Sequence, residues 1–284
     1  MVARLSAVGA ALLASTMSVA AACPDDAEAA RFAKEWQARA PAKGVAVETI
    51  ADAACARDKF VAILEKGGAK PVGYKAALTA KAVQERFKAN APVMGVLLDS
   101  MILSDGAAVP AAFGARPVFE ADMLLVVKDD GINAAKTPEE AIRHISGMRP
   151  FIELPDLVLA AGEKLEGPQL LAINAGARMG VAGAEVPLSP TPETVRMLAD
   201  VKIVMTDGAG ATLAEGTGAA TLGNPLNSVI WLASDLAASG KKLKAGDLVS
   251  VGSFSPLIPP KPGQQVSVRY EGFPGTPKVG VSFQ

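Results

Sequence analysis

The stretch from which the fold can be inferred is Arg116-Pro117-Val118-Phe119-Glu120-Ala121-Asp122-Met123-Leu124-Leu125-Val126-Val127. Its β-branched and long apolar residues predict a strand, and Asp129-Asp130-Gly131 is a turn signal that closes it. Side chains alternate between the two faces of a strand. Glu120 and Asp122 therefore lie side by side on one face, among apolar neighbours.

Two adjacent carboxylates on an apolar face repel each other, and their desolvation adds to the cost. A divalent cation relieves both effects, and hard oxygen ligands favour Mg²⁺, Mn²⁺ or Ca²⁺ over zinc. The alternative is a strand whose polar face meets water. A third carboxylate, Glu153, stands at the centre of the short apolar run 150–156. If the two strands pair, Glu120, Asp122 and Glu153 can converge on one metal ion.

Other blocks of sequence follow one another in a fixed order. They are Gly73-Tyr74-Lys75 with Leu78-Thr79, Gly95-Val96-Leu97 with Asp99, the Glu120 strand, Glu153, the run 223–233 (GNPLNSVIWLA), and Leu243-Lys244-Ala245-Gly246-Asp247 with Gly252-Ser253. In this order they resemble the fumarylacetoacetate hydrolase superfamily, in its branch of 2-keto-4-pentenoate hydratases and 2-oxohept-3-enedioate hydratases. The resemblance extends from about residue 45 to the C-terminus.

The resemblance implies an α+β fold, in which a mixed, curved β-sheet of roll-like or sandwich-like form carries the site between flanking helices. It implies a small helical part over residues 23–70 and a catalytic domain over 71–284. The implied activity is a metal-dependent hydratase (a lyase) of aromatic catabolism, which adds water to a 2-hydroxy-2,4-dienoate or 2-oxo-enoate. The type reaction converts 2-hydroxypenta-2,4-dienoate to 4-hydroxy-2-oxopentanoate. Homo-oligomers are common in the family.

The resemblance also assigns residues to roles. Mg²⁺ or Mn²⁺ would be held by Glu120, Asp122 and Glu153. Lys75 would face the active site, with Thr79 and Ser253 as further substrate contacts. Lys75 and Glu153 are the catalytic candidates, although Glu153 is already assigned to the metal and the general base stays open.

One segment departs from the family pattern. The hydratases carry D-N-A-S-S or a similar run where this chain has Ile173-Asn174-Ala175-Gly176-Ala177, so Ile173 replaces an acid. Either the site works without that group, or the substrate differs, or catalysis has been lost. The alternatives to a hydratase are therefore a 2-oxo acid decarboxylase, an acylpyruvate hydrolase, and an exported 2-oxo acid binding protein without turnover. The only histidine, His144, lies on a predicted helix, which counts against hydrolysis through a His–Glu pair.

The first 22 residues have the features of a secretory signal peptide. Arg4 precedes an apolar run of small residues, and Ala20-Ala21-Ala22 is a cleavage signal. The expectation is export to the periplasm without a membrane span after cleavage, with lipidation of Cys23 as the alternative. In an oxidising compartment Cys23 and Cys55 can form a disulfide, and the alternative is two unrelated thiols. A net charge of −1 gives no electrostatic case for nucleic-acid binding.

Local patterns predict the remaining elements. These are helices within residues 24–66, a strand over 71–79, a short helix over 80–87, a helix begun by Thr137-Pro138, a hairpin over 201–216, a helix over 224–238, and strands over 248–251, 265–270 and 278–283.

Overall fold

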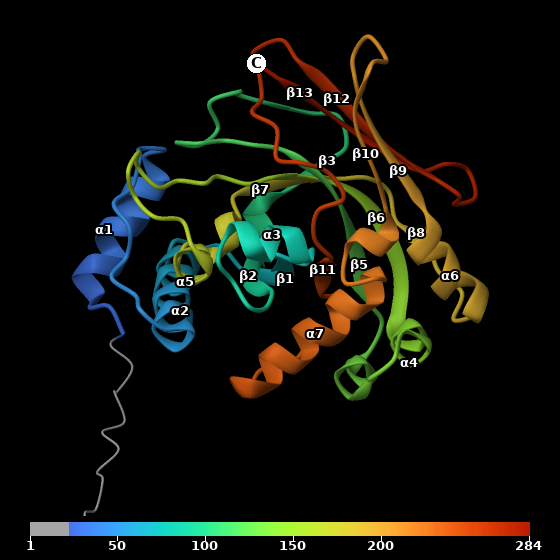
Figure 1. Cartoon of the computed structure of the whole chain (residues 1–284), viewed down its shortest axis with the longest axis horizontal. Helices are drawn as coiled ribbons and strands as arrows, with labels where there is room; N and C mark the ends of the chain where they lie inside the picture. Colours follow the sequence, from blue (N-terminus) through green and yellow to red (C-terminus); the bar gives the residue numbers. More distant parts are fainter. Residues whose placement is uncertain (1–22) are drawn as a thin grey trace, which may run out of the picture.

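The computed structural model describes residues 23–284 and contains two mixed β-sheets with helices around them (Figure 1). The larger sheet has the order β2 (Val93–Leu98), β1 (Pro71–Ala77), β11 (Leu248–Ser250), β5 (Glu120–Val127), β6 (Ile145–Leu154), β7 (Met179–Ala182) and β3 (Ile102–Ser104), with β8 (Val186–Pro187) beside β6. The second has the order β10 (Thr212–Thr217), β9 (Lys202–Asp207), β12 (Gln265–Glu271), β13 (Lys278–Phe283) and β4 (Ala107–Val109).

The sheets are mixed because β1 and β11, β3 and β7, and β4 and β13 pair in parallel while the other strands pair antiparallel. In Figure 1, β5 and β6 form a strongly curved ribbon, and β9, β10, β12 and β13 stand together at the upper right. The predicted α+β class with a mixed, curved sheet is confirmed.

The central strand is shorter than the sequence predicts. It begins at Glu120 rather than Arg116, and the residues before it make only isolated bridges, Pro117 to Asp156 and Phe119 to Ile258. Pro117 has no backbone N–H to donate to a ladder, which fits its place outside the strand. The predicted alternation is found. One face of the stretch packs into the main core through Phe119, Ala121, Met123, Leu125 and Val127.

Helices cover the sheets. Asn224 caps α7 (Pro225–Ala238), and Thr191 caps α6 (Pro192–Asp200). Thr137 caps α4 (Pro138–Ala141) as predicted, but α4 ends after four residues. His144 lies in the following 3₁₀ turn (Ile142–His144) instead of on an α-helix. Its Nδ1 is 2.6 Å from the Asp129 carboxylate, which fixes the partly exposed ring beyond the opposite end of β5 from Glu120.

A second core joins the N-terminal helices to the larger sheet. It is built from α1 (Asp26–Gln37), α2 (Ile50–Lys66), α5 (Gly167–Ala172) and residues of β2. The short helix α3 (Lys81–Arg86) follows β1. Figure 1 shows α1, α2 and α5 gathered on one side of the molecule, away from β9 and β10. The division into parts 23–70 and 71–284 stays a prediction.

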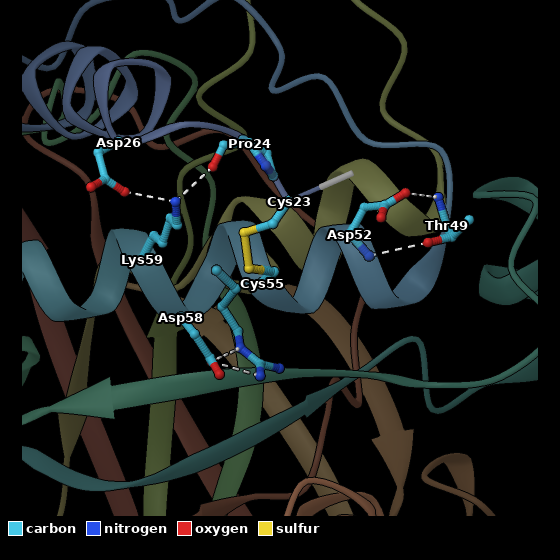
Figure 2. Close-up of a disulfide and its surroundings, with 9 residues drawn as sticks. Cys23, Pro24, Asp26, Thr49, Asp52, Cys55, Asp58 and Lys59 are labelled. Atoms are coloured by element: carbon cyan, nitrogen blue, oxygen red, sulfur yellow. Dashed lines mark hydrogen bonds and ion pairs between the residues drawn. A yellow bond between two sulfur atoms is a disulfide. The ribbon is translucent and has the colours of Figure 1, made fainter. Parts of the chain in front are cut away.

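A disulfide joins the start of the described chain to α2. Cys23 and Cys55 are bonded, with their Cα atoms 5.6 Å apart, so the disulfide hypothesis is confirmed (Figure 2). Beside it, the Lys59 ammonium donates to the Asp26 carboxylate at 2.6 Å and to the Pro24 carbonyl at 2.9 Å. The segment before α1 is therefore held on α2 by a covalent bond and an ion pair.

The predicted signal peptide, residues 1–22, lies outside the described residues. Within residues 23–284 no helix is both long enough and apolar enough to span a bilayer.

Candidate functional site

The centre of the site is the β5–β6 ladder. These strands pair antiparallel with Glu120 directly opposite Glu153, and Asp122 follows two residues along the same face. Lys75 reaches the pair from β1: its ammonium contacts a Glu153 carboxylate oxygen and donates to the Ala175 carbonyl at 3.0 Å. The exposed fraction is at most 8% for all four charged side chains. The structure thus brings together four residues that come from three separate segments of the sequence.

Burial makes it costly for Glu120, Asp122 and Glu153 all to be ionised beside a single ammonium, that of Lys75. Burial, followed by the nearby Glu153 charge, raises the pKa of Glu120 well above its usual range. The same two causes raise the pKa of Asp122 to about 8. Burial by itself would lower the pKa of Lys75, but the carboxylates of Glu153 and Glu120 outweigh it and hold that pKa above its usual value. One ammonium therefore faces three carboxylates, which must share protons or gain another cation.

Asp122 is held by groups from the neighbouring strand. The Ser250 hydroxyl on β11 donates to one carboxylate oxygen, and the backbone N–H of Gly252 donates to the other at 3.1 Å. Gly252 has a φ of +106°, and a Cβ there would overlap the Thr79 side chain. A glycine is therefore required where the chain passes between Asp122 and Thr79.

The acidic group has the donor chemistry of a magnesium or manganese site. All its ligands would be carboxylate oxygens, and Oε2 of Glu153 is buried without a hydrogen-bond partner among the described residues. As the side chains stand, no three His, Cys, Asp or Glu residues of the described range 23–284 are grouped to hold an ion. The reason is visible in the contacts: Asp122 is bonded to Ser250, and Glu153 to Lys75. The residues fit a hard cation provided that Asp122 leaves Ser250.

A cavity of about 140 Å³ lies beside this group. Its polar lining comes from Lys75, Thr79, Glu120, Ser253 and Ser255, together with Arg86. The other lining residues include Ala76, Leu78, Val83, Phe87, Pro155, Leu157, Leu170, Pro256 and Leu257. The predicted substrate contacts Lys75, Thr79 and Ser253 thus share one cavity with Glu120, whereas Asp122 and Glu153 are not among its lining residues.

Ile173, which replaces the acid of the family pattern, does not line the cavity. Its side chain is buried in the second core, with the N-terminal helices. Asn174 and Ala175 follow it in the left-handed region, with φ values of +58° and +52°. The Asn174 side chain pairs with both backbone groups of Val96, at 2.7 and 2.9 Å. This anchor holds the turn that presents the Ala175 carbonyl to Lys75.

Several residues of the site were missed by sequence reasoning. Ser250 holds Asp122, and Ser255 lines the cavity while accepting a hydrogen bond from the Ala121 N–H at 2.9 Å. The Tyr270 hydroxyl on β12 donates to the Asp122 carbonyl and accepts from the Phe151 N–H at 3.0 Å, which joins the second sheet to the back of the site. No local pattern marks these residues, because each acts through a partner more than 100 positions away.

The chain is similar to known proteins over most of its length, although no family model matches it. It is 30% identical over 207 residues to a 2-keto-4-pentenoate hydratase of Paraburkholderia xenovorans, which covers 72% of this chain and 74% of that protein. It is 29% identical over 226 residues to a 2-hydroxyhexa-2,4-dienoate hydratase of Comamonas testosteroni, with 79% and 83% covered. A solved structure, the 4-oxalocrotonate decarboxylase of Pseudomonas putida G7 with magnesium and adipate, superposes with a TM-score of 0.81 at 26% identity, over 91% of this chain and 97% of that one.

Proposed function

The chain belongs to the fumarylacetoacetate hydrolase superfamily, in its 2-keto-4-pentenoate hydratase branch, and from that premise we propose that it adds water to a 2-hydroxy-2,4-dienoate. The type reaction of the branch converts 2-hydroxypenta-2,4-dienoate to 4-hydroxy-2-oxopentanoate. The observation that carries the proposal is the buried group of Glu120, Asp122, Glu153 and Lys75 beside a small apolar cavity. The relatives named above are hydratases, and the proposal adds the substrate of this chain.

Glu120, Asp122 and Glu153 would hold Mg²⁺ or Mn²⁺, which when bound supplies a Lewis acid for the negative charge that develops on the substrate oxygens. The excess of carboxylates over ammonium supports this assignment, since a buried group of this charge is costly without a further cation. The magnesium in the related decarboxylase supports it as well.

Lys75 is the proposed proton donor. An ammonium has three N–H donors, and Lys75 uses two of them, on Glu153 and on the Ala175 carbonyl. The third is available to the cavity that Lys75 lines. Because the neighbouring carboxylates keep Lys75 protonated, it can donate a hydrogen bond or a proton to the substrate when the dienol becomes a ketone.

The remaining lining groups bind the substrate and exclude bulk water. The hydroxyls of Thr79, Ser253 and Ser255 can accept or donate hydrogen bonds to the carboxylate of the acid. Apolar side chains surround the carbon chain and strengthen the electrostatic effect of Lys75, because they replace water around it.

The test is to follow loss of the dienoate absorbance with the full chain in Mg²⁺ or Mn²⁺, and to measure metal binding by calorimetry. We expect turnover and binding in the wild type, and loss of both in Glu120→Gln and Glu153→Gln. The matched control is Glu139→Gln, an exposed glutamate outside the site. Full activity in either site variant would refute the assignment.

A second candidate is decarboxylation of a related 2-oxo dioate. It is favoured by the similarity in structure to the 4-oxalocrotonate decarboxylase, which extends over 91% of this chain. The same residues would serve, because decarboxylation of a 2-oxo dioate also develops negative charge at the 2-oxygen. Release of carbon dioxide in place of hydrated product would identify this reaction.

Export of the protein is also proposed. The disulfide between Cys23 and Cys55 supports it, because such bonds persist in oxidising compartments. Cell fractionation tests the proposal: we expect the protein in the periplasmic fraction, with residues 1–22 removed. A cytoplasmic protein with an intact N-terminus would contradict it.

A further inference from the structure

The rim of the cavity carries a second cation whose charge no residue of the site neutralises. Arg86 lines the cavity, and its guanidinium lies 5.9 Å from the centre of the Phe87 ring, which lines it too. Within residues 23–284 Arg86 forms no ion pair with an acidic side chain. Lys88 next to it is paired with Glu166 at 2.7 Å. Arg86 is therefore a positive charge without an acidic partner in the described range, at the edge of a cavity whose lining is mostly apolar.

The same edge exposes an apolar side chain. Val83 precedes Arg86 by three residues on α3, so the two lie on one face of that helix. Both line the cavity, and Val83 is one of two large hydrophobic side chains in the described range that are exposed, at 38%. A ligand that fills the cavity would cover Val83 and bring its outer end to Arg86.

The cavity thus has two cationic ends of different character. Lys75 is buried at the inner end, beside the carboxylates, and Arg86 is exposed at the outer end. Glu120 is the only acidic residue among the lining residues, and it belongs to the inner group. An acid whose 2-oxo end lies at Lys75 would extend its carbon chain past Leu78 and Phe87 toward Arg86.

We propose that Arg86 is a specificity-determining residue that binds a second carboxylate, so that the substrate is a 2-oxo or 2-hydroxy unsaturated dioate rather than a monoacid. This rests on the proposed function, since it places the 2-oxo end at the Lys75 group. A guanidinium can bind a carboxylate through two parallel hydrogen bonds, a geometry that favours arginine over other cations. A substrate that ended in a methyl group instead of a second carboxylate would form no ion pair with Arg86 and would gain no affinity from it.

The experiment compares two saturated probes of equal chain length, 2-oxoadipate and 2-oxohexanoate, which differ only in the outer carboxylate. Binding to the full chain in Mg²⁺ is measured by calorimetry for wild type, Arg86→Gln, Arg86→Lys and the control Arg143→Gln. Arg143 is exposed, has no acidic partner in the described range, and lies outside the cavity.

We expect wild type and Arg143→Gln to bind 2-oxoadipate roughly tenfold more tightly than 2-oxohexanoate, as one charge-assisted contact allows. Arg86→Gln should lose this preference by weakening 2-oxoadipate alone, and Arg86→Lys should keep part of it. The preference should also shrink as salt is raised, because Arg86 is exposed.

Four results would overturn the proposal. Equal binding of the two acids by the wild type would show that the outer carboxylate is not recognised. A preference that survives in Arg86→Gln would assign recognition to another residue. Equal weakening of both acids in Arg86→Gln would mean that Arg86 only attracts anions. If neither acid binds any variant in Mg²⁺, the proposed function fails, and the dioate assignment fails with it.

Discussion

Two buried ion pairs of this protein have similar chemistry and different surroundings. Lys75 and Glu153 meet between β1 and β6, and Arg178 and Asp156 meet at the junction with the N-terminal helices. In each pair both side chains are at most 7% exposed. The two pairs differ in how completely their polar atoms are satisfied.

Every polar group of the Asp156 carboxylate has a partner. It accepts from the backbone N–H groups of Ala115 and Arg116, at 3.1 and 2.8 Å, and from the Arg178 guanidinium at 3.3 Å. Arg178 donates in turn to the Trp36 carbonyl on α1 at 2.9 Å, and its guanidinium lies 4.3 Å from the centre of the Trp36 ring. This pair fastens α1 to the main part of the molecule.

The Lys75–Glu153 pair is incomplete by comparison. Among residues 23–284 one Glu153 oxygen has no hydrogen-bond partner, and the raised pKa values of Glu120 and Asp122 show that ionising them beside Glu153 is costly even with Lys75 present. A buried charge is normally paired, so an unsatisfied group beside a cavity indicates a site prepared for a ligand. The comparison therefore supports the proposal that Lys75 and Glu153 belong to a functional site, because their polar atoms are less completely satisfied than those of the equally buried Arg178–Asp156 pair.

The largest expected effect is on turnover in Lys75→Met. We expect kcat to fall by about 10²–10³-fold, because the proposed donor next to the developing charge is removed. Calorimetry should show that Mg²⁺ binding is retained or tighter, since a cation that opposes the metal is gone. Lys244→Met, at an exposed lysine, is the control. Turnover within tenfold of wild type would make Lys75 a merely structural partner of Glu153.

The second effect is on stability in Arg178→Met. We expect the free energy of unfolding to fall by about 3–5 kcal/mol, because the Asp156 carboxylate stays buried without its cation. Urea unfolding measures this loss, and Arg143→Met is the control. Mg²⁺ affinity of the folded variant should be unchanged. A loss below about 1 kcal/mol, the usual value of a surface pair, would remove the contrast between the two pairs.

A third prediction concerns the N-terminal part that Arg178 fastens. Replacing Cys23 and Cys55 together by serine removes a cross-link between residues 32 positions apart. We expect a loss of about 3–4 kcal/mol in the free energy of unfolding, from the added freedom of the unfolded chain. Metal binding in the folded protein should not change. If metal binding falls in parallel with stability, the N-terminal helices and the acidic group are energetically coupled. The two ion pairs could then not be separated into a structural one and a functional one.

The last prediction, with the smallest effect per pH unit, is a pH dependence at Asp122 beside the Lys75–Glu153 pair. The pKa of Asp122 is about 8 in the folded protein against 3.8 ordinarily, so the folded state binds the proton more tightly. The contribution of Asp122 to the stability of the metal-free protein is therefore complete below pH 3.8 and is lost as pH rises toward 8. The slope cannot exceed about 1.4 kcal/mol per pH unit for one proton.

Urea unfolding between pH 5 and about pH 8, the pKa of Asp122 in the folded protein, measures how the free energy of unfolding changes with pH. This slope should be reduced in Asp122→Asn and in wild type saturated with Mg²⁺, which competes with the proton for the carboxylates. Asp235→Asn is a control at another carboxyl whose burial raises its pKa but which lies far in sequence from the acidic group. Identical slopes in wild type and Asp122→Asn would contradict the placement of the proton on Asp122.

Much of the fold was predictable because its signals are local. The strands at 265–270 and 278–283, the hairpin of β9 and β10, the helix over 224–238 and the cap Thr137 depend on neighbouring residues and agree with the structure. The predicted start of the strand at Arg116 and the predicted helix through His144 were wrong. β5 begins where Glu120 pairs with Glu153 of β6, and such long-range pairing is not contained in a local pattern.

The site was partly predictable for the same reason. Alternation along one strand places Glu120 and Asp122 together, but the orientation of Asp122 is set by Ser250, 128 positions away. Ile173 was placed by analogy with an acid in the active site, and tertiary packing puts it in the second core instead. No sequence pattern around Arg86 predicted a role in binding, because a single arginine on a short helix resembles any other surface charge.

By itself the sequence determined the β patterning, the carboxylates that share a strand face, the cysteines able to pair, and the ordered motifs that identify the family. Only the tertiary structure decided that Glu153 stands opposite Glu120, that Lys75 and Glu120 line one cavity, and that Arg86 lines it without an acidic partner among residues 23–284. The physical reason is that periodicity and capping act over a few residues. Satisfaction of a buried charge depends on every group that folding brings within hydrogen-bond distance.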